Sequence, residues 1–130
     1  MSLNAKIDTA PIILIVEDDH SIGEVISTII VQETSYRSCI VETGDDAWRL
    51  LQTFKPEAII LDYRLPDMTG IDLYDRLQTR TDLQRIPVVL TSASDHQDEI
   101  EQRDLLTLDK PFDIEDLLDA IRRCMFSHMQ

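Results

Sequence analysis

The sequence predicts an α/β fold, a doubly wound parallel sheet of five strands with helices on both faces. One observation is a set of unalternating apolar runs, typical of strands that are buried on both faces. Another is that these runs alternate with segments in which apolar residues recur at helical spacing. Short connections between them favour successive right-handed strand–helix–strand units. At 130 residues, with 43% apolar and 28% charged residues, the chain has the size and composition of one globular domain.

In chain order, the apolar run at 11–16 is the first strand, and a helix follows it. Ser21 and Glu24 form a capping-box pattern at the start of that helix. A short second strand is expected at 37–41, and Thr43 is expected to cap the second helix. Helical spacing predicts two buried stripes: Ile22, Val25, Ile26, Ile29 and Ile30 in the first helix, and Ala47, Leu50, Leu51 and Phe54 in the second.

The second half of the chain continues the alternation. The central strand is expected at 58–61, and further buried strands at 86–90 and 105–108. Thr69 is expected to cap the third helix and Asp113 the last one. The predicted inner faces of these helices carry Ile71, Leu73, Tyr74 and Leu77 in the third, and Ile114, Leu117, Leu118, Ile121 and Met125 in the last.

The fourth helix is the weak element of the pattern. Residues 95–104 contain one aliphatic side chain, Ile100, so a helix there has almost nothing with which to pack against a sheet. We therefore expect a fourth helix that is one or two turns long or disordered. The face that it would share with the last strand and last helix is then remodelled or unused.

Two of the predicted strands end in carboxylates. Glu17, Asp18 and Asp19 follow the first strand, and Asp62 follows the central one. In open α/β sheets, ligands bind at the edge formed by the carboxyl ends of the strands. Crowded carboxylates repel one another unless a cation joins them, and a small set of hard oxygen ligands favours Mg²⁺. The sequence therefore predicts a magnesium site at this edge.

The totals exclude several other classes. A net charge of −13 lacks the basic footprint of a nucleic-acid-binding protein. Cys39 and Cys124 form no CxxC pattern, and no apolar run reaches membrane-spanning length, so we expect a reduced, cytoplasmic protein. No signal peptide is visible. Of the histidines, only His20 lies beside the acidic cluster in the sequence, and it is expected to be a solvated residue.

Four motifs occur in order along the chain: IVEDD after the first strand, LDYRLPDMTG at the central strand, LTSA after the fourth strand and DKPF after the fifth. In this order they resemble the receiver domain of two-component response regulators, over residues 11–125. The resemblance implies the flavodoxin-like strand order 2-1-3-4-5. We place the receiver domain at 11–126. Residues 1–10 lack periodicity and are expected to be a flexible tail, and residues 127–130 a C-terminal tail.

The same resemblance implies the roles of the site residues. Asp62 would accept a phosphoryl group, with the Ser92 hydroxyl and the Lys110 ammonium beside it. The peptide before Pro111 would be cis, as is usual in the family. The implied ligands of Mg²⁺ are Glu17, mostly through a water, Asp18, Asp62 and the backbone carbonyl of Arg64. Arg64 and Ser94, which flank the site, are expected to tune the access of water to the phosphate.

The implied function is a switch in a phosphorelay rather than an enzyme. The phosphoryl donor would be a sensor histidine kinase or a histidine phosphotransfer protein, and the output an altered docking to another protein. Phosphorylation would be autocatalysed and autodephosphorylation slow. Because little follows the last helix, the sequence is expected to be either a single-domain regulator or a receiver excised from a longer chain.

The chain departs from the family around the switch. Thr107 stands where most receivers have an aromatic residue, the usual Gly-Ala turn is missing, and Ser92 and Lys110 are only 18 residues apart. One alternative is therefore a degenerate receiver that binds partners without phosphorylation. Flavodoxins and aspartyl-phosphate hydrolases of the haloacid dehalogenase type share parts of the pattern. Taken singly, each site residue also has a structural role, as a turn former, a cap or a solvated charge.

Overall fold

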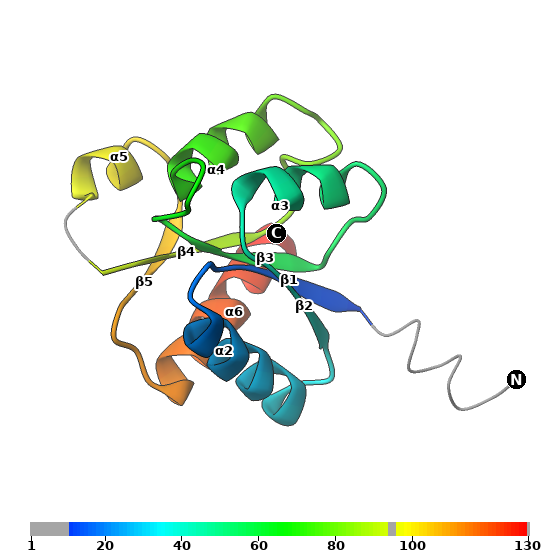
Figure 1. The fold of residues 1–130 in the computed structure, drawn as a ribbon, viewed down its shortest axis with the longest axis vertical. Coiled ribbons are helices and arrows are strands. Elements are labelled where there is room, and N and C mark those ends of the chain that lie inside the picture. The colour runs from blue at the N-terminus through cyan, green and yellow to red at the C-terminus, as the bar shows by residue number, and fades with distance from the viewer. Residues whose placement is uncertain (1–10, 94–95, 130) are drawn as a thin grey trace, which may run out of the picture.

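The computed structural model describes residues 11–93 and 96–129 of the chain. The expected tail at 1–10 and Ser94 lie outside this part. Five parallel strands form one sheet in the order β2-β1-β3-β4-β5, which confirms the predicted doubly wound architecture (Figure 1). The strands are β1 (Ile12–Val16), β2 (Arg37–Val41), β3 (Ala58–Asp62), β4 (Val88–Ser92) and β5 (Leu106–Asp109). The helices are α2 (His20–Glu33), α3 (Gly44–Leu51), α4 (Gly70–Gln78), α5 (Gln97–Glu101) and α6 (Ile114–Met129).

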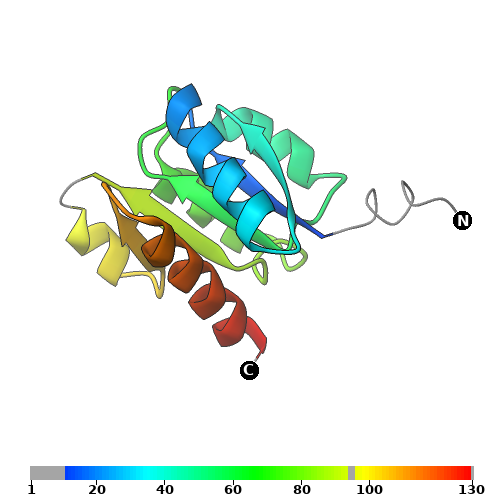
Figure 2. The ribbon, with the colours of Figure 1, turned by 90° about the horizontal axis from the view of Figure 1, so that it is seen from below.

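The sheet separates two apolar layers. Helices α2 and α6 cover one face, while α3, α4 and α5 lie on the other (Figures 1 and 2). Alternate residues of β1 supply both layers, because Ile13 and Ile15 pack against α2 and α6 whereas Leu14 and Val16 face α3 and α4. Burial on both sides therefore explains why this strand is apolar at every position.

Three of the predicted helix caps are present. Thr43 accepts a hydrogen bond from the backbone N–H of Asp46, and Thr69 forms a capping box at the start of α4. Asp113 Oδ1 accepts from Asp116 N–H at 2.8 Å at the start of α6. The predicted cap of the first helix was wrong, because Asp19 rather than Ser21 is the N-cap of α2. Asp19 lies in extended backbone, and its Oδ1 accepts from Ile22 N–H at 3.1 Å.

Three predicted core positions were also wrong. Val25 is 56% exposed and Ile114 is 47% exposed, although both fall at helical spacing. Phe54 is half-buried but lies beyond α3, which ends at Leu51. Period alone does not fix the edges of a buried stripe, since the width of the stripe depends on how closely the sheet approaches the helix. Helix α6 also continues to Met129, past the expected domain end at 126.

The short fourth helix of the sequence prediction is confirmed in α5, which has five residues. Ile100 is its buried aliphatic side chain. Polar contacts supplement this one anchor, because the Arg103 guanidinium forms two hydrogen bonds of 2.7 Å with the Asp75 carboxylate of α4. These contacts place α5 beside α4 near the β5 edge of the sheet (Figure 1).

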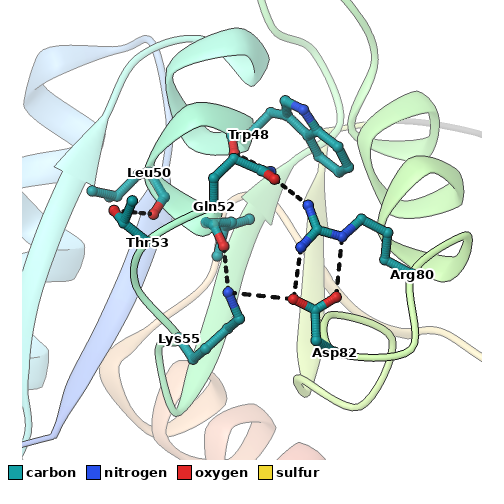
Figure 3. A network of polar contacts seen from close by, with 8 residues as sticks. Trp48, Leu50, Gln52, Thr53, Lys55, Arg80 and Asp82 are labelled. Atoms are coloured by element: carbon teal, nitrogen blue, oxygen red, sulfur yellow. Dashed lines mark hydrogen bonds and ion pairs between the residues drawn. The ribbon is translucent and has the colours of Figure 1, made fainter.

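A cluster of charged and aromatic side chains joins α3 to the segment that follows α4 (Figure 3). The Arg76 guanidinium lies over the Trp48 ring, 4.1 Å from its centroid. Arg80 hydrogen-bonds both Gln52, which follows α3, and Asp82, which follows α4. This cluster fixes α3 relative to α4, and the loops that shape the site precede both helices.

Candidate functional site

The acidic and basic residues predicted from the sequence meet at the carboxyl edge of the sheet. Strands β1 and β3 are neighbours, so Glu17, which follows β1, lies beside Asp62, which ends β3. The turn after β5 brings in Lys110. They line a cavity of about 260 Å³, whose other lining residues are Asp18, Asp19, Ile22, Tyr63, Arg64, Ser92, Ala93 and His96.

Lys110 joins the two buried carboxylates. Its Nζ donates to Glu17 Oε1 at 2.8 Å and to Asp62 Oδ1 at 3.1 Å. Burial acts to lower the pKa of Lys110, but the bonds and charges of Glu17 and Asp62 outweigh burial and raise it, so the amine stays protonated. The peptide between Lys110 and Pro111 is cis, as the resemblance implied.

The carboxylates themselves form a compact group. Oxygen atoms of Glu17, Asp18 and Asp62 all lie within 4.8 Å of one another. Burial raises the pKa of Glu17, and this outweighs the hydrogen bonds from Lys110 and from the N–H of Asp19. Three carboxylates and one ammonium leave two negative charges in the cluster when all are ionised. Hard oxygen donors with this charge are the donor set that a divalent cation such as Mg²⁺ prefers.

Hydroxyl groups come from the end of β4. Ser92 is buried at the cavity, and its backbone carbonyl accepts from Lys110 N–H at 2.9 Å, which fixes the turn that carries the lysine. Thr91 was not singled out from the sequence. Its hydroxyl lies 3.5 Å from Asp62 Oδ1, because the two residues are paired across β3 and β4. Only the strand register reveals this contact.

An aromatic pair forms another part of the cavity wall. The rings of Tyr63 and His96 stack with centroids 3.6 Å apart and planes 11° from parallel. The Tyr63 hydroxyl donates to Glu99 Oε1 at 2.7 Å, and this bond is the main cause that raises the pKa of Tyr63. His20, the histidine nearest the acidic cluster in sequence, instead begins α2 with a side chain that is 81% exposed. The histidine at the cavity is His96, which sequence proximity did not indicate.

The loop between β3 and α4 holds Arg64 at the cavity. Arg64 forms an isolated bridge with Thr69, so the loop closes on itself. The Asp67 carboxylate accepts from the N–H groups of Gly44 and Asp45, both at 2.9 Å, which ties the loop to the start of α3. Burial acts to raise the pKa of Asp67, but these two hydrogen bonds, together with one from its own backbone N–H, outweigh burial and lower it.

Gly70 ends this loop at a point of very close backbone approach. Its N–H donates to the Tyr63 carbonyl at 2.6 Å. A Cβ at this position would lie 2.5 Å from the carbonyl oxygen of Asp62 and 2.9 Å from Leu90 Cδ1. None of the three glycines has a positive φ, so Gly70 is needed for space rather than for a turn conformation.

Within residues 11–93 and 96–129, every helix is too short or too polar to span a membrane.

Comparison with known proteins gives a consistent family. The response regulator receiver domain family matches residues 13–122. Over 116 residues the chain is 32% identical to the transcriptional regulatory protein KdpE of Staphylococcus aureus, a match that covers 85% of this chain and 48% of that protein. The chain thus spans about half the length of this relative. It is also 29% identical over 115 residues to sporulation initiation phosphotransferase F of Bacillus subtilis, covering 85% of this chain and 90% of that one.

A solved structure agrees with the sequence matches. The receiver domain of a sensor histidine kinase from Pseudomonas aeruginosa superposes with a TM-score of 0.80 at 26% identity, covering 91% of this chain and 99% of that one. That structure contains a magnesium ion coordinated in its active site cleft. These matches decide against the flavodoxin and dehalogenase alternatives. Since the family match covers most of the chain and the strand order is that of the family's fold, the chain belongs to the response regulator receiver domain family.

Proposed function

We propose that the chain is a phosphorylation-dependent signalling switch in which Asp62 accepts a phosphoryl group from a phosphohistidine. The observation that carries this proposal is the position of Lys110, whose ammonium bonds both Glu17 and Asp62 at the wall of the acidic cavity. A carboxylate can attack an anionic phosphoryl group only where its charge is offset, and phosphoryl transfer depends mainly on positioning and charge neutralisation.

The contacts of Asp62 suggest which oxygen reacts. Lys110 Nζ and the Thr91 hydroxyl both approach Oδ1, so we assign Oδ2 as the nucleophile. Its attack forms the O–P bond of an acyl phosphate while the P–N bond of the donor breaks, and the electron pair leaves with the imidazole nitrogen. Lys110 then lies beside the phosphoryl oxygens, and the Ser92 hydroxyl is the second donor that we assign to them.

Glu17, Asp18, Asp62 and the backbone carbonyl of Arg64 are the groups that would hold Mg²⁺. When bound, the cation supplies positive charge to the phosphoryl oxygens. The three clustered carboxylates support this assignment, as does the magnesium ion in the related receiver from Pseudomonas aeruginosa. Asp18 is exposed at the cavity, so its carboxylate is accessible to solvent as well as to the site.

The test is incubation with acetyl phosphate and Mg²⁺ followed by intact mass measurement. We expect one added phosphate on the wild-type protein and none on Asp62→Asn. Asp109→Asn is the matched control, because Asp109 is an exposed acid at the end of β5 on the same edge of the sheet, and it should still be phosphorylated. EDTA should abolish the labelling, since the incoming dianion then meets unshielded carboxylates. A wild-type protein that takes no phosphate would instead support the degenerate, phosphorylation-independent receiver.

An apolar groove beside the cavity supports a protein as the phosphoryl donor. Ile22, Val25 and Ile26 of α2 line it together with Pro111 and Phe112, and its volume is about 430 Å³. The cavity and the groove share Ile22, Ala93 and Lys110, so a helix docked here would place a phosphohistidine near Asp62. Val25→Glu should slow transfer from a phosphorylated histidine phosphotransfer protein while leaving labelling by acetyl phosphate unchanged, because the small donor needs no groove. Val31→Glu, an equally exposed position near the far end of α2, is the control.

A further inference from the structure

The position of α5 depends on few contacts, and two of them come from one residue next to the phosphoacceptor. Ile100 is the buried aliphatic side chain of α5, while Asp98 and Glu101 are exposed. The N-cap residue, His96, makes no side-chain capping bond. A five-residue helix is not stable by itself, so its side-chain contacts with the rest of the domain decide where it lies.

Tyr63 makes contact with both ends of the first turn of this helix. Its ring stacks on His96 before the helix, and its hydroxyl donates to Glu99 within the helix at 2.7 Å. The backbone of Tyr63 is fixed on both sides. Its N–H donates to the Thr91 carbonyl at 2.8 Å, and its carbonyl accepts from Gly70 N–H at 2.6 Å. The side chain is therefore a short link from the end of β3 to α5.

The link begins inside the cavity. Tyr63 follows Asp62 directly, and Tyr63 and His96 line the same cavity as Asp62 and Lys110. A phosphoryl group brings up to two negative charges into this space. These charges repel the Glu99 carboxylate, which accepts from the Tyr63 hydroxyl and whose Oε1 lies 3.8 Å from His96 Nδ1. Phosphorylation is therefore expected to weaken the bond between Tyr63 and Glu99.

Most receivers have an aromatic residue where this chain has Thr107, which is half-buried on β5. An aromatic side chain at this position therefore cannot transmit the signal here. We propose that Tyr63 couples phosphorylation of Asp62 to α5, so that the short helix and its link to α4 through Arg103 and Asp75 form the surface that responds. This inference rests on the proposed function and deepens it.

Hydrogen exchange of the α5 amides, measured with and without acetyl phosphate and Mg²⁺, tests the coupling. Intact mass on the same samples reports how much phosphate is bound. The amide of Ile100, which donates to the His96 carbonyl at 3.0 Å, should exchange about threefold to tenfold faster after phosphorylation, as expected for loss of about one hydrogen bond. Amides in the centre of β1 should not change.

Tyr63→Phe keeps the ring and removes the bond to Glu99. We expect this variant to show faster α5 exchange before phosphorylation and little further change after it. Glu99→Gln keeps an acceptor for the hydroxyl but removes the charge, and should also reduce the response. Tyr74→Phe is the matched control, because Tyr74 is a half-buried tyrosine of α4 in the same apolar layer, and it should respond as the wild type does.

The outcomes separate the two proposals. Absence of added mass on the wild-type protein would overturn both the phosphoacceptor assignment and the coupling. Full phosphorylation with unchanged α5 exchange would overturn the coupling alone. A response in Tyr63→Phe equal to that of the wild type would also overturn the coupling, since the bond between Tyr63 and Glu99 would then not be needed for the response.

Discussion

Replacing Gly70 by alanine should push the loop between β3 and α4 away from the end of β3, where Asp62 lies. The new Cβ would lie 2.5 Å from the Asp62 carbonyl oxygen, whereas an ordinary carbon–oxygen contact is about 3.3 Å or more. Strand β3 is buried at every residue and cannot retreat, so the loop must move outward. Overpacking of this kind costs about 1–3 kcal/mol, and weakening the bond to the Tyr63 carbonyl adds about 1 kcal/mol. We expect a loss of about 2–4 kcal/mol in the free energy of unfolding.

Gly23→Ala is the matched control for this prediction. Gly23 lies in the interior of α2, where a Cβ would meet Ile40 Cγ2 at 3.4 Å, an ordinary contact. Alanine favours a helix over glycine by about 0.5–1 kcal/mol, so this variant should be more stable than the wild type. Urea unfolding followed by circular dichroism measures both changes. A Gly70→Ala protein as stable as the wild type, or equal losses in the two variants, would refute a close contact between residue 70 and the Asp62 carbonyl.

Three further predictions concern charge. Asp67→Asn should lower the free energy of unfolding by about 1 kcal/mol at neutral pH, because one carboxylate accepts two backbone N–H bonds there. The pKa of Asp67 in the folded protein is below its ordinary value of 3.8. The difference in stability between Asp67→Asn and the wild type should therefore be present above about pH 4 and vanish as the pH falls through the folded pKa. A difference that persists at low pH would contradict a role for the ionised carboxylate. Mg²⁺ at ten times its dissociation constant should raise the free energy of unfolding by about 1.4 kcal/mol. Asp18→Asn should reduce this gain, whereas Asp19→Asn, at the α2 cap, should not. Equal gains in calorimetric scans of the two variants would exclude the carboxylate cluster as the magnesium site. The double variant Trp48→Leu/Arg76→Gln should lose less free energy of unfolding than the sum of the two single variants, by about 0.5–1 kcal/mol. Additive losses in denaturant unfolding would be evidence against a stabilising cation–π contact between α3 and α4.

Much of the site was predictable because it lies at strand ends. The apolar runs before Glu17 and Asp62 identified two buried strands, and parallel neighbours carry their carboxyl ends to the same edge of the sheet. The caps at Thr43 and Thr69 were predictable because side chain and spacing define them locally. Lys110 follows the short strand expected at 105–108, so the same strand-end argument placed it at this edge, and the order of the motifs supported it.

The remaining features depend on distances that no local pattern contains. Thr91 approaches Asp62 through the register of β3 and β4, and the stack of Tyr63 on His96 joins two separate loops. The exposure of Val25 depends on how α2 packs on the sheet. Two candidate caps two residues apart, Asp19 and Ser21, cannot be separated by residue type because both are good N-caps.

Reduction of the phosphorylated protein with borohydride tests the central assignment most directly. Borohydride converts an acyl phosphate to a primary alcohol, so a phosphorylated aspartate becomes homoserine and can be located by peptide mass spectrometry. We predict homoserine at position 62, and only in samples that contained both Mg²⁺ and acetyl phosphate. Homoserine at Asp18 or Asp67 in place of Asp62, or none in a protein shown to be folded, would contradict the account.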